Sequence, residues 1–349
     1  MIEFDLTKTP VVVLNWKGIE DTIKALESLL VQEMVSHVVL IDNDSDQNEK
    51  QRLRALSEAN PRIDLIENPR NLGFGKAHNH VFRLLKQKGF EFVACLNNDA
   101  VADEFWIKEL VNCAFERKAS IVASLMVMES NKELVDTAGH QMLSTGEIIP
   151  RGQGEVTSNY SDYHEVIGAC AGACLYDLKM LDKLGYFDER FFVGYEDAEL
   201  GLRAWLCGYT CVYSPKAIVH HKMSTSIGRI RSTEYLSVIQ SHIFYTWFKL
   251  MPLKIILVQF PAMVFKYSMV VVVDIVFLRF KFLKVMVVAI LKTFRQFPQF
   301  SRARNDFYSN HNVERSFREI NQSLIPFLAF DIKRFWSFVI LKRKSALEK

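Results

Sequence analysis

Apolar and polar residues alternate in blocks over the first half of the chain. The β-branched apolar run 11–16 is followed by apolar positions at spacings of four, three and four residues, Ile19, Ile23, Leu26 and Leu30. The run is typical of a strand buried on both faces, and the spacing is typical of an amphipathic helix. The same patterns predict further strands and helices at 37–46, 47–59, 63–66, 103–117 and 121–128. Strands that alternate with helices predict a doubly wound, mostly parallel α/β sheet.

Polar residues gather where the predicted strands end. In sheets of this kind ligands bind at the carboxyl ends of the strands. Those ends carry Asn15, then Asp42 to Asp44, then the loop 68–79, and then Asn97 to Asp99. A single polar loop needs no ligand to explain it, but four at one edge of a sheet favour a ligand site.

The glycines exclude the commonest phosphate-binding loops. No G-x-G-x-x-G follows the strand 11–16, Gly73 and Gly75 lack a third glycine, and no G-x4-G-K-[ST] occurs. A phosphate-bearing ligand would then be held through a divalent cation on carboxylate oxygens, and Asp99 is the candidate. A simple turn at Asn98 and Asp99 is the alternative.

The segment 185–226 combines an acid cluster with two histidines. They are Glu196, Asp197 and Glu199, in the first turn of a predicted helix, and His220 and His221 after a short strand. Aromatic residues before the acids would wall a pocket and raise a carboxylate pKa, as a general base requires. The helix dipole and an i,i+4 ion pair would also favour acids here, so a structural role is the alternative.

Charge divides the chain into two regions. The net charge of the 349 residues is +3, but residues 1–234 carry 25 Lys and Arg against 34 Asp and Glu. Residues 235–349 carry 18 basic against 6 acidic residues. Two regions of opposite charge predict two different kinds of partner.

Residues 235–305 join basic side chains to dense apolar runs. They contain ten Lys and Arg and one acid, Asp274, and the charge-free run 255–265 has 11 residues. Because a spanning helix needs about 20 residues, we expect this region to lie on an anionic membrane surface. A helical subdomain packed on the first region or in a dimer interface is the alternative. Long apolar runs do not suit a nucleic-acid groove, so we expect no nucleic-acid partner.

Seven pieces of the sequence, in order, resemble the family 2 glycosyltransferases, in particular the bacterial rhamnosyltransferase-like branch. They are VVVLNW, LIDNDSD, NPRNLGFGKAHN, LNNDA, GACAGACLY, GYFDERFFVGYEDAELGLRAWLCGY and VYSPKAIVHH, which together cover about residues 10–226. The resemblance implies a GT-A fold, which we expect at residues 1–233, followed by a basic, apolar helical region at residues 234–349. It implies an inverting transfer of a sugar, with rhamnose as the candidate, from a nucleoside-diphosphate donor to a lipid-linked or glycan acceptor. The product would be O-antigen or another cell-surface polysaccharide, made at the cytoplasmic face of the plasma membrane.

The resemblance also implies roles for individual residues. Asp42 would contact the nucleotide base, and Asp99 would hold Mg²⁺ or Mn²⁺ on the diphosphate. Asp197 would be the general base on the acceptor hydroxyl, with Glu196 beside it and next in line. The other residues that would frame the nucleotide are Asn15, Asn71, Gly73, Gly75, Asn79 and Asn98.

A histidine would join Asp99 at the cation. His220 is the first choice and His221 the second. Many relatives have Asp-x-Asp at the metal position, whereas Asn97 stands here at the first position. A neutral oxygen donor supplies no charge, so Asp99 would carry more of the metal affinity.

Two other classes of protein fit the sequence less well. A nucleotidyltransferase, or another enzyme that processes nucleotide sugars, would use a similar sheet but consume no sugar acceptor. A non-catalytic relative would have lost its site, for which Asn97 is the one hint, and the retained carboxylates argue against it.

Overall fold

The computed structural model describes residues 7–222, 232–278 and 280–335, which form two compact units. The first unit lies within Met1–His140, Pro150–Trp205 and Tyr209–Thr225. The second lies within Gln141–Ile149, Leu206–Gly208 and Ser226–Lys349. The second unit therefore takes in a segment from the middle of the chain as well as C-terminal residues. The catalytic and membrane roles expected for 1–233 and 234–349 stay predictions.

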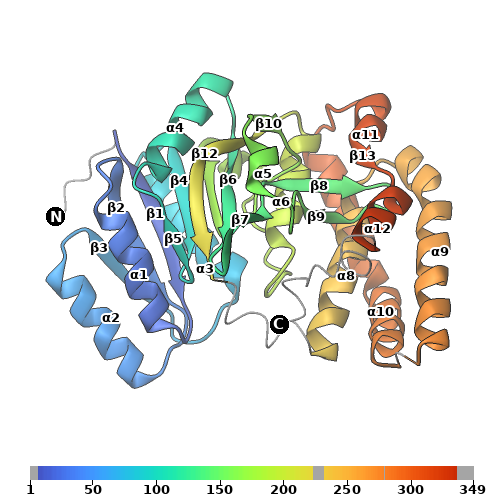
Figure 1. Ribbon diagram of the computed structural model, residues 1–349, viewed down its shortest axis with the longest axis horizontal. Coiled ribbons are helices and arrows are strands. Elements are labelled where there is room, and N and C mark those ends of the chain that lie inside the picture. Colours follow the sequence, from blue (N-terminus) through green and yellow to red (C-terminus); the bar gives the residue numbers. More distant parts are fainter. Residues whose placement is uncertain (1–6, 223–231, 279, 336–349) are drawn as a thin grey trace. The chain divides into compact units, whose positions relative to one another are not determined.

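The first unit is built on a ten-stranded sheet (Figure 1). The strand order is β10-β12-β6-β11-β4-β1-β2-β3, with β5 paired to β12 and β7 to β6. The strands are β1 (Thr9–Asn15), β2 (Val35–Asp42), β3 (Ile63–Glu67), β4 (Phe92–Asn97), β5 (Ala100–Ala102), β6 (Ile121–Met128), β7 (Asn131–Thr137), β10 (His164–Glu165), β11 (Ala173–Asp177) and β12 (Cys211–His221). β1 runs parallel to β2 and β4, whereas β11 is antiparallel to β4 and β6. The expected mostly parallel sheet is confirmed.

Helices cover both faces of this sheet. They are α1 (Ile19–Leu30), α2 (Gln47–Ala59), α3 (Phe74–Gln87), α4 (Trp106–Arg117), α5 (Leu178–Leu184) and α6 (Glu196–Leu206), with a 3₁₀ turn, η1 (Thr157–Tyr160). Leu26 of α1 and Trp106 of α4 share one core cluster with Val11 of β1. On the other face, the ring of Phe82 from α3 lies 6.2 Å from that of Tyr176 on β11. β1 is buried along its length because both faces are covered, as its β-branched run predicted.

Most predicted bounds agree with the structure, but the loop 68–79 does not. α2 and β6 have the predicted bounds. The loop ends at Gly73, because α3 begins at Phe74 and contains Gly75 and Asn79. Gly73 has φ of 80° and ψ of 175°, a backbone conformation that non-glycine residues rarely adopt.

The small residues of segment 168–176 allow a close backbone approach. A Cβ atom on Gly201 of α6 would lie 2.6 Å from the Cα atom of Gly168. A Cβ atom on Gly172 would lie 2.8 Å from the side-chain nitrogen of Asn97, at the end of β4. Glycine at these positions therefore lets α6 and the end of β4 pack directly on the 168–172 backbone.

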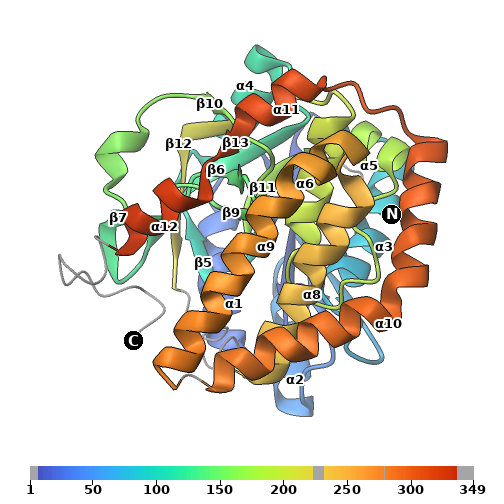
Figure 2. The same cartoon turned by 90° about the vertical axis from the view of Figure 1, so that its right-hand side faces the viewer.

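The second unit is mainly helical, with a three-stranded sheet of order β13-β8-β9. Its elements are β8 (His140–Leu143), β9 (Ile148–Pro150), α8 (Thr233–Leu250), α9 (Leu253–Val276), α10 (Phe280–Asn310), α11 (Phe317–Ser323), β13 (Leu324–Ile325) and α12 (Phe327–Phe335). Figure 2 shows α8, α9 and α10 lying alongside one another. The predicted helical region is confirmed for the described residues.

Helix α9 is longer and more apolar than the sequence suggested. It has 24 residues, with a mean hydropathy of 1.9 over 18 of them, and is long and apolar enough to cross a membrane. The charge-free run 255–265 understated the length of this apolar helix, because α9 continues through Lys266 and Asp274. Lys266 pairs with Glu147, and Asp274 is 4% exposed, so both charges lie on the inward face.

Candidate active site

The polar strand ends meet at one edge of the sheet, as predicted. Asn15 at the end of β1 is in register with Asp42 at the end of β2. On the other side of β1, Leu14 is in register with Asn97 at the end of β4. Both Asn15 and Asp42 are fully buried. Because parallel strands end at the same level, three loops far apart in sequence form one polar edge.

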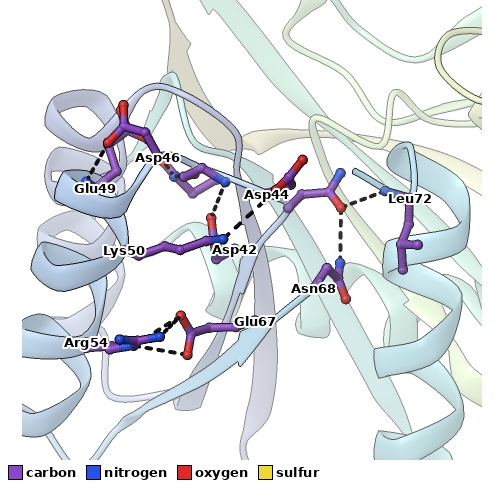
Figure 3. Close-up of polar contacts among 12 residues, drawn as sticks. Asp42, Asp44, Asp46, Glu49, Lys50, Arg54, Glu67, Asn68 and Leu72 are labelled. Carbon is purple, nitrogen blue, oxygen red and sulfur yellow. Dashed lines mark hydrogen bonds and ion pairs between the residues drawn. The ribbon is translucent and has the colours of Figure 1, made fainter. Parts of the chain in front are cut away.

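Asp42 has one carboxylate oxygen that the described protein leaves without a hydrogen bond. The backbone N–H of Ser45 donates to Oδ1 at 3.0 Å, whereas Oδ2 is buried and has no hydrogen-bond partner among the described residues. Figure 3 shows Lys50 between two carboxylates, with Nζ 4.0 Å from Oδ2 of Asp42 and 3.9 Å from Oδ1 of Asp44. An N–H group of a ligand would satisfy this buried acceptor.

Three asparagines hold the loop that follows β3. Oδ1 of Asn43 accepts hydrogen bonds from the side chain of Asn68 and the backbone N–H of Leu72, both at 3.0 Å. Nδ2 of Asn43 donates to Oδ1 of Asn71 at 2.9 Å. The same oxygen of Asn71 also accepts the N–H of Gly73 at 2.8 Å. Asn71, which we expected at the nucleotide, therefore shapes this loop.

Asn15 and Asn98 use their amides inside the protein. Nδ2 of Asn15 donates to Oγ of Ser45 at 2.8 Å and to Oε2 of Glu49 at 3.2 Å. Its Oδ1 accepts the hydroxyl of Thr22 at 2.6 Å, and the amide of Asn98 donates to the same hydroxyl at 3.2 Å. These bonds join the ends of β1 and β4 to α1 and α2. Both asparagines thus position the edge, and the expected direct contact of Asn15 with the nucleotide gains no support from its geometry.

Gly73, Gly75 and Asn79 hold the segment before the acid cluster. A Cβ atom on Gly73 would clash with the carbonyl oxygen of Phe192, and one on Gly75 would lie 3.1 Å from Cβ of Phe187. The buried amide of Asn79 donates to the carbonyl of Phe187 at 2.9 Å and accepts its N–H at 3.0 Å. The fully buried side chain of Asn79 thus has a structural contact, and its expected contact with the nucleotide stays a prediction.

Buried Asp99 and partly buried His221 form an acid–imidazole pair. Asp99 lies between β4 and β5, and His221 ends β12, opposite Ala100 of β5. Oδ1 of Asp99 lies 3.1 Å from Nε2 of His221, and Oδ2 of Asp136 lies 2.8 Å from Nδ1 of the same ring. Burial alone would lower the pKa of His221, but the hydrogen bonds and charges of both carboxylates outweigh it and raise that pKa to about 10. His221 in turn outweighs the effect of burial on Asp99, whose pKa is lowered.

His220 lies on the other face of β12. Its Nε2 atom is 2.9 Å from Oδ1 of Asp103. Successive side chains of a strand point to opposite faces, so only one of two neighbouring histidines can contact Asp99. The preference for His220 beside Asp99 was therefore wrong, and His221 takes that place.

Asp99 and His221 could hold a divalent cation if the cation displaces the proton on Nε2 of His221. Within residues 7–222, 232–278 and 280–335 no cluster of three or more Asp, Glu, His or Cys side chains could hold a metal ion, so these two would be the protein ligands. Their 3.1 Å separation matches the edge of an octahedron, about 3 Å when each ligand lies about 2.1 Å from the ion. A carboxylate and an imidazole suit Mn²⁺, and the remaining positions would be left for phosphate oxygens and water.

The acid cluster contains two carboxyl groups in different environments. Oδ2 of Asp197 accepts the backbone N–H of Ala171 at 3.0 Å, and Oδ1 accepts that of Ala198 at 2.8 Å. Glu196 is 5% exposed, and its Oε2 finds no hydrogen-bond partner in the described part of the chain. Burial, and then the negative charge of Asp197, raise the pKa of Glu196 to about 8. Glu196 therefore carries a proton at neutral pH, which leaves Asp197 as the base candidate.

Glu199 has the structural role that its spacing allowed. Arg203 donates to both carboxylate oxygens of Glu199, at 3.1 and 2.8 Å, and the pair is buried. The same guanidinium donates to the backbone carbonyls of Leu184 and Tyr186, at 2.5 and 2.6 Å. Glu199 thus supports the turn that leads into the acid cluster.

Sequence reasoning missed Lys50 and Asp136. Asp42 ends β2 and Lys50 lies on α2, so no periodic pattern in the sequence links the two residues. Asp136 lies 85 residues from His221 in a stretch without a motif, so only the tertiary structure reveals their contact.

Residues 11–185 match the family described as glycosyl transferase family 2. The chain belongs to this family. It is 29% identical over 244 residues to the O-antigen biosynthesis protein RfbC of Myxococcus xanthus, covering 64% of this chain and 18% of that protein. It is 25% identical over 241 residues to an N-acetylglucosaminyl-diphospho-decaprenol L-rhamnosyltransferase of Mycobacterium tuberculosis, covering 63% of this chain and 78% of that protein. The expected family 2 membership is confirmed.

The fold of this family 2 glycosyltransferase is also found in a solved structure. The crystal structure of GalNAc-T7 with UDP, GalNAc and Mn²⁺ superposes with a TM-score of 0.53 at 14% identity, covering 70% of this chain and 50% of that one. At this identity the likeness shows the fold alone, and the GT-A expectation is confirmed. The family match ends before α6 and β12, so the roles of Asp197 and His221 depend on geometry.

Proposed function

We propose that this glycosyltransferase moves a sugar from a nucleoside-diphosphate donor to a lipid-linked or glycan acceptor during synthesis of a cell-surface polysaccharide. One observation carries the proposal. The polar edge made by β1, β2 and β4 carries two features that suit a nucleoside diphosphate. Asp42 is a buried carboxylate whose Oδ2 has no hydrogen-bond partner among the described residues, and Asp99 with His221 could hold a cation. The named functions of the O-antigen and L-rhamnosyl relatives support the acceptor class and make rhamnose the candidate sugar.

The donor would be held at its two ends. Oδ2 of Asp42 would accept an N–H of the base, because it is the buried acceptor at the end of β2. Asp99 and His221 would hold Mg²⁺ or Mn²⁺ against the diphosphate. When bound, the cation supplies Lewis-acid stabilisation of the charge that develops on the leaving diphosphate. The Mn²⁺ and UDP in the structure of GalNAc-T7 support this assignment.

The acceptor would be activated at the start of α6. Asp197 would take the proton of the attacking hydroxyl, and the two backbone N–H groups of Ala171 and Ala198 hold its carboxylate in place. Glu196, protonated at neutral pH, would donate a hydrogen bond in the acceptor site. A single displacement of this kind needs one base and no covalent nucleophile, and it inverts the anomeric carbon.

The second unit would attach the enzyme to an anionic membrane surface, at the cytoplasmic face. The outward face of α9 exposes large apolar side chains along its length, among them Leu257, Phe260, Phe265, Val272 and Ile275. Its inward face carries several polar side chains: Lys266 and Tyr267 both bond Glu147, and Gln259 accepts from Trp247 at 2.6 Å. Because these polar groups bond to others within the unit while the outward face is apolar, we propose that α9 lies in the interface plane although its length suffices to span.

The test is a panel of nucleoside-diphosphate sugars offered to the purified enzyme with Mn²⁺ and lipid-linked or glycan acceptors. Release of nucleoside diphosphate should require the acceptor and should stop when EDTA removes the cation. Formation of a nucleotide sugar from sugar phosphate and nucleoside triphosphate, with no acceptor present, would replace the proposal by a nucleotidyltransferase.

A further inference from the structure

Asp136 is the second carboxylate that contacts His221. Its Oδ2 lies 2.8 Å from Nδ1, while Oδ1 of Asp99 lies 3.1 Å from Nε2 across the ring. Asp136 is buried, at 7% exposure. The imidazole is therefore held at both nitrogens. The proposed cation ligand Asp99 contacts Nε2, and Asp136, which is not a proposed cation ligand, contacts Nδ1.

The backbone of β7 is irregular where it presents Asp136. Thr137 pairs with Met126, and Val135 pairs with the next residue of β6, so the described ladder skips Asp136. One extra residue in one strand of an antiparallel pair is a β-bulge, which redirects a side chain and is common beside active sites. β12 pairs with the same part of β6 along its other edge, so the Asp136 side chain reaches His221 across β6.

We propose that Asp136 is a positioning residue for the cation site. By accepting the Nδ1–H of His221, it fixes the plane of the ring and leaves Nε2, the nitrogen beside Asp99, as the one that would release its proton and bind a cation. A carboxylate behind a metal-binding histidine has this effect, and it also makes the imidazole a stronger ligand. The inference rests on the proposed cation site and adds a residue that acts through His221.

The experiment measures Mn²⁺ affinity of the full chain by electron paramagnetic resonance, with and without UDP. Loss of a carboxylate behind a metal-binding histidine weakens metal affinity about 10- to 100-fold, so the Kd for Mn²⁺ should rise by that factor in Asp136→Ala. Asp103→Ala is the matched control, because Asp103 contacts the neighbouring His220 at 2.9 Å on the opposite face of β12. That control should keep the wild-type Kd.

A double-mutant cycle separates positioning from support of the fold. His221→Ala removes the group through which Asp136 is proposed to act. Adding Asp136→Ala to His221→Ala should therefore cost no further Mn²⁺ affinity. A residue that only stabilised β7 would cost about the same affinity in both backgrounds.

An unchanged Kd in folded Asp136→Ala, or an equal loss in both backgrounds, would overturn the inference. If circular dichroism shows that Asp136→Ala is unfolded, Asp136→Asn, which keeps the shape and removes the charge, enters the same cycle with the same expected direction. Failure of the cation site itself would show separately, because Asp99→Ala would then bind Mn²⁺ as tightly as the wild type.

Discussion

Two adjacent carboxyl groups at the start of α6 are expected to differ in chemistry. Asp197→Asn keeps the shape and the contacts with Ala171 but removes the basic oxygen. Turnover should fall by about 10²-fold or more, the usual contribution of a general base, while donor affinity changes little. Steady-state kinetics at pH 7 and nucleotide titrations measure the two quantities. Near-normal turnover in Asp197→Asn, with a collapse in Glu196→Gln, would move the base to Glu196.

The buried Glu196 should also make stability depend on pH. Its pKa is about 8 in the folded protein and 4.5 without the fold, so the folded state binds the extra proton between these values. Stability must therefore fall as pH rises from about 4.5 to about 8, because ionisation in the native state is disfavoured. Glu196→Gln should remove this part of the slope and be the more stable protein at pH 8.5. Urea unfolding at pH 5 and pH 8.5 tests this, and parallel curves for the two proteins would contradict it.

At the scale of elements, α6 depends on a glycine contact. A Cβ atom at Gly201 would lie 2.6 Å from Cα of Gly168, so Gly201→Ala must push α6 away from the 167–168 backbone. Overpacking of this kind costs about 1–3 kcal/mol, and the shift should move the Asp197 carboxylate away from the N–H of Ala171. We expect a lower melting temperature and a larger loss of turnover than of donor affinity. Wild-type turnover in this variant would show that the position of α6 is not critical.

Local patterns predicted the elements well because their signals lie within one segment. The β-branched run of β1 and the apolar spacing of α1 need no distant partner, and α2 and β6 have the predicted bounds. Because ligands bind at the carboxyl ends of parallel strands, the sequence also predicted that Asp42 and Asp99 lie at the same edge of the sheet, as they do. Two details of the site were not predicted, because they depend on the backbone geometry of single strands and on contacts between segments far apart in the sequence. The pleat of β12 decides between His220 and His221, and a bulge in β7 presents Asp136.

At the scale of the whole molecule, the charge pattern and the outward face of α9 predict membrane attachment. The full chain should sediment with anionic liposomes, and high salt should release only part of it, because apolar insertion remains when charges are screened. Replacing Leu257, Phe265 and Val272 by Asp should abolish sedimentation. The control replaces Phe105 and Phe115 by Asp, since these side chains of the first unit are equally exposed, at 57% and 58%. If the α9 variant still sediments like the wild type, α9 is not the attachment surface.

The central claim is that the polar edge of the sheet holds a nucleoside diphosphate through a cation on Asp99. Calorimetric titration of nucleoside diphosphates into the wild type and Asp99→Ala, each with Mn²⁺ and with EDTA, tests it most directly. The wild type should bind tightly with Mn²⁺ and far more weakly with EDTA, while Asp99→Ala should bind weakly in both conditions. Equal affinity in all four titrations would contradict the account and remove the cation from this site.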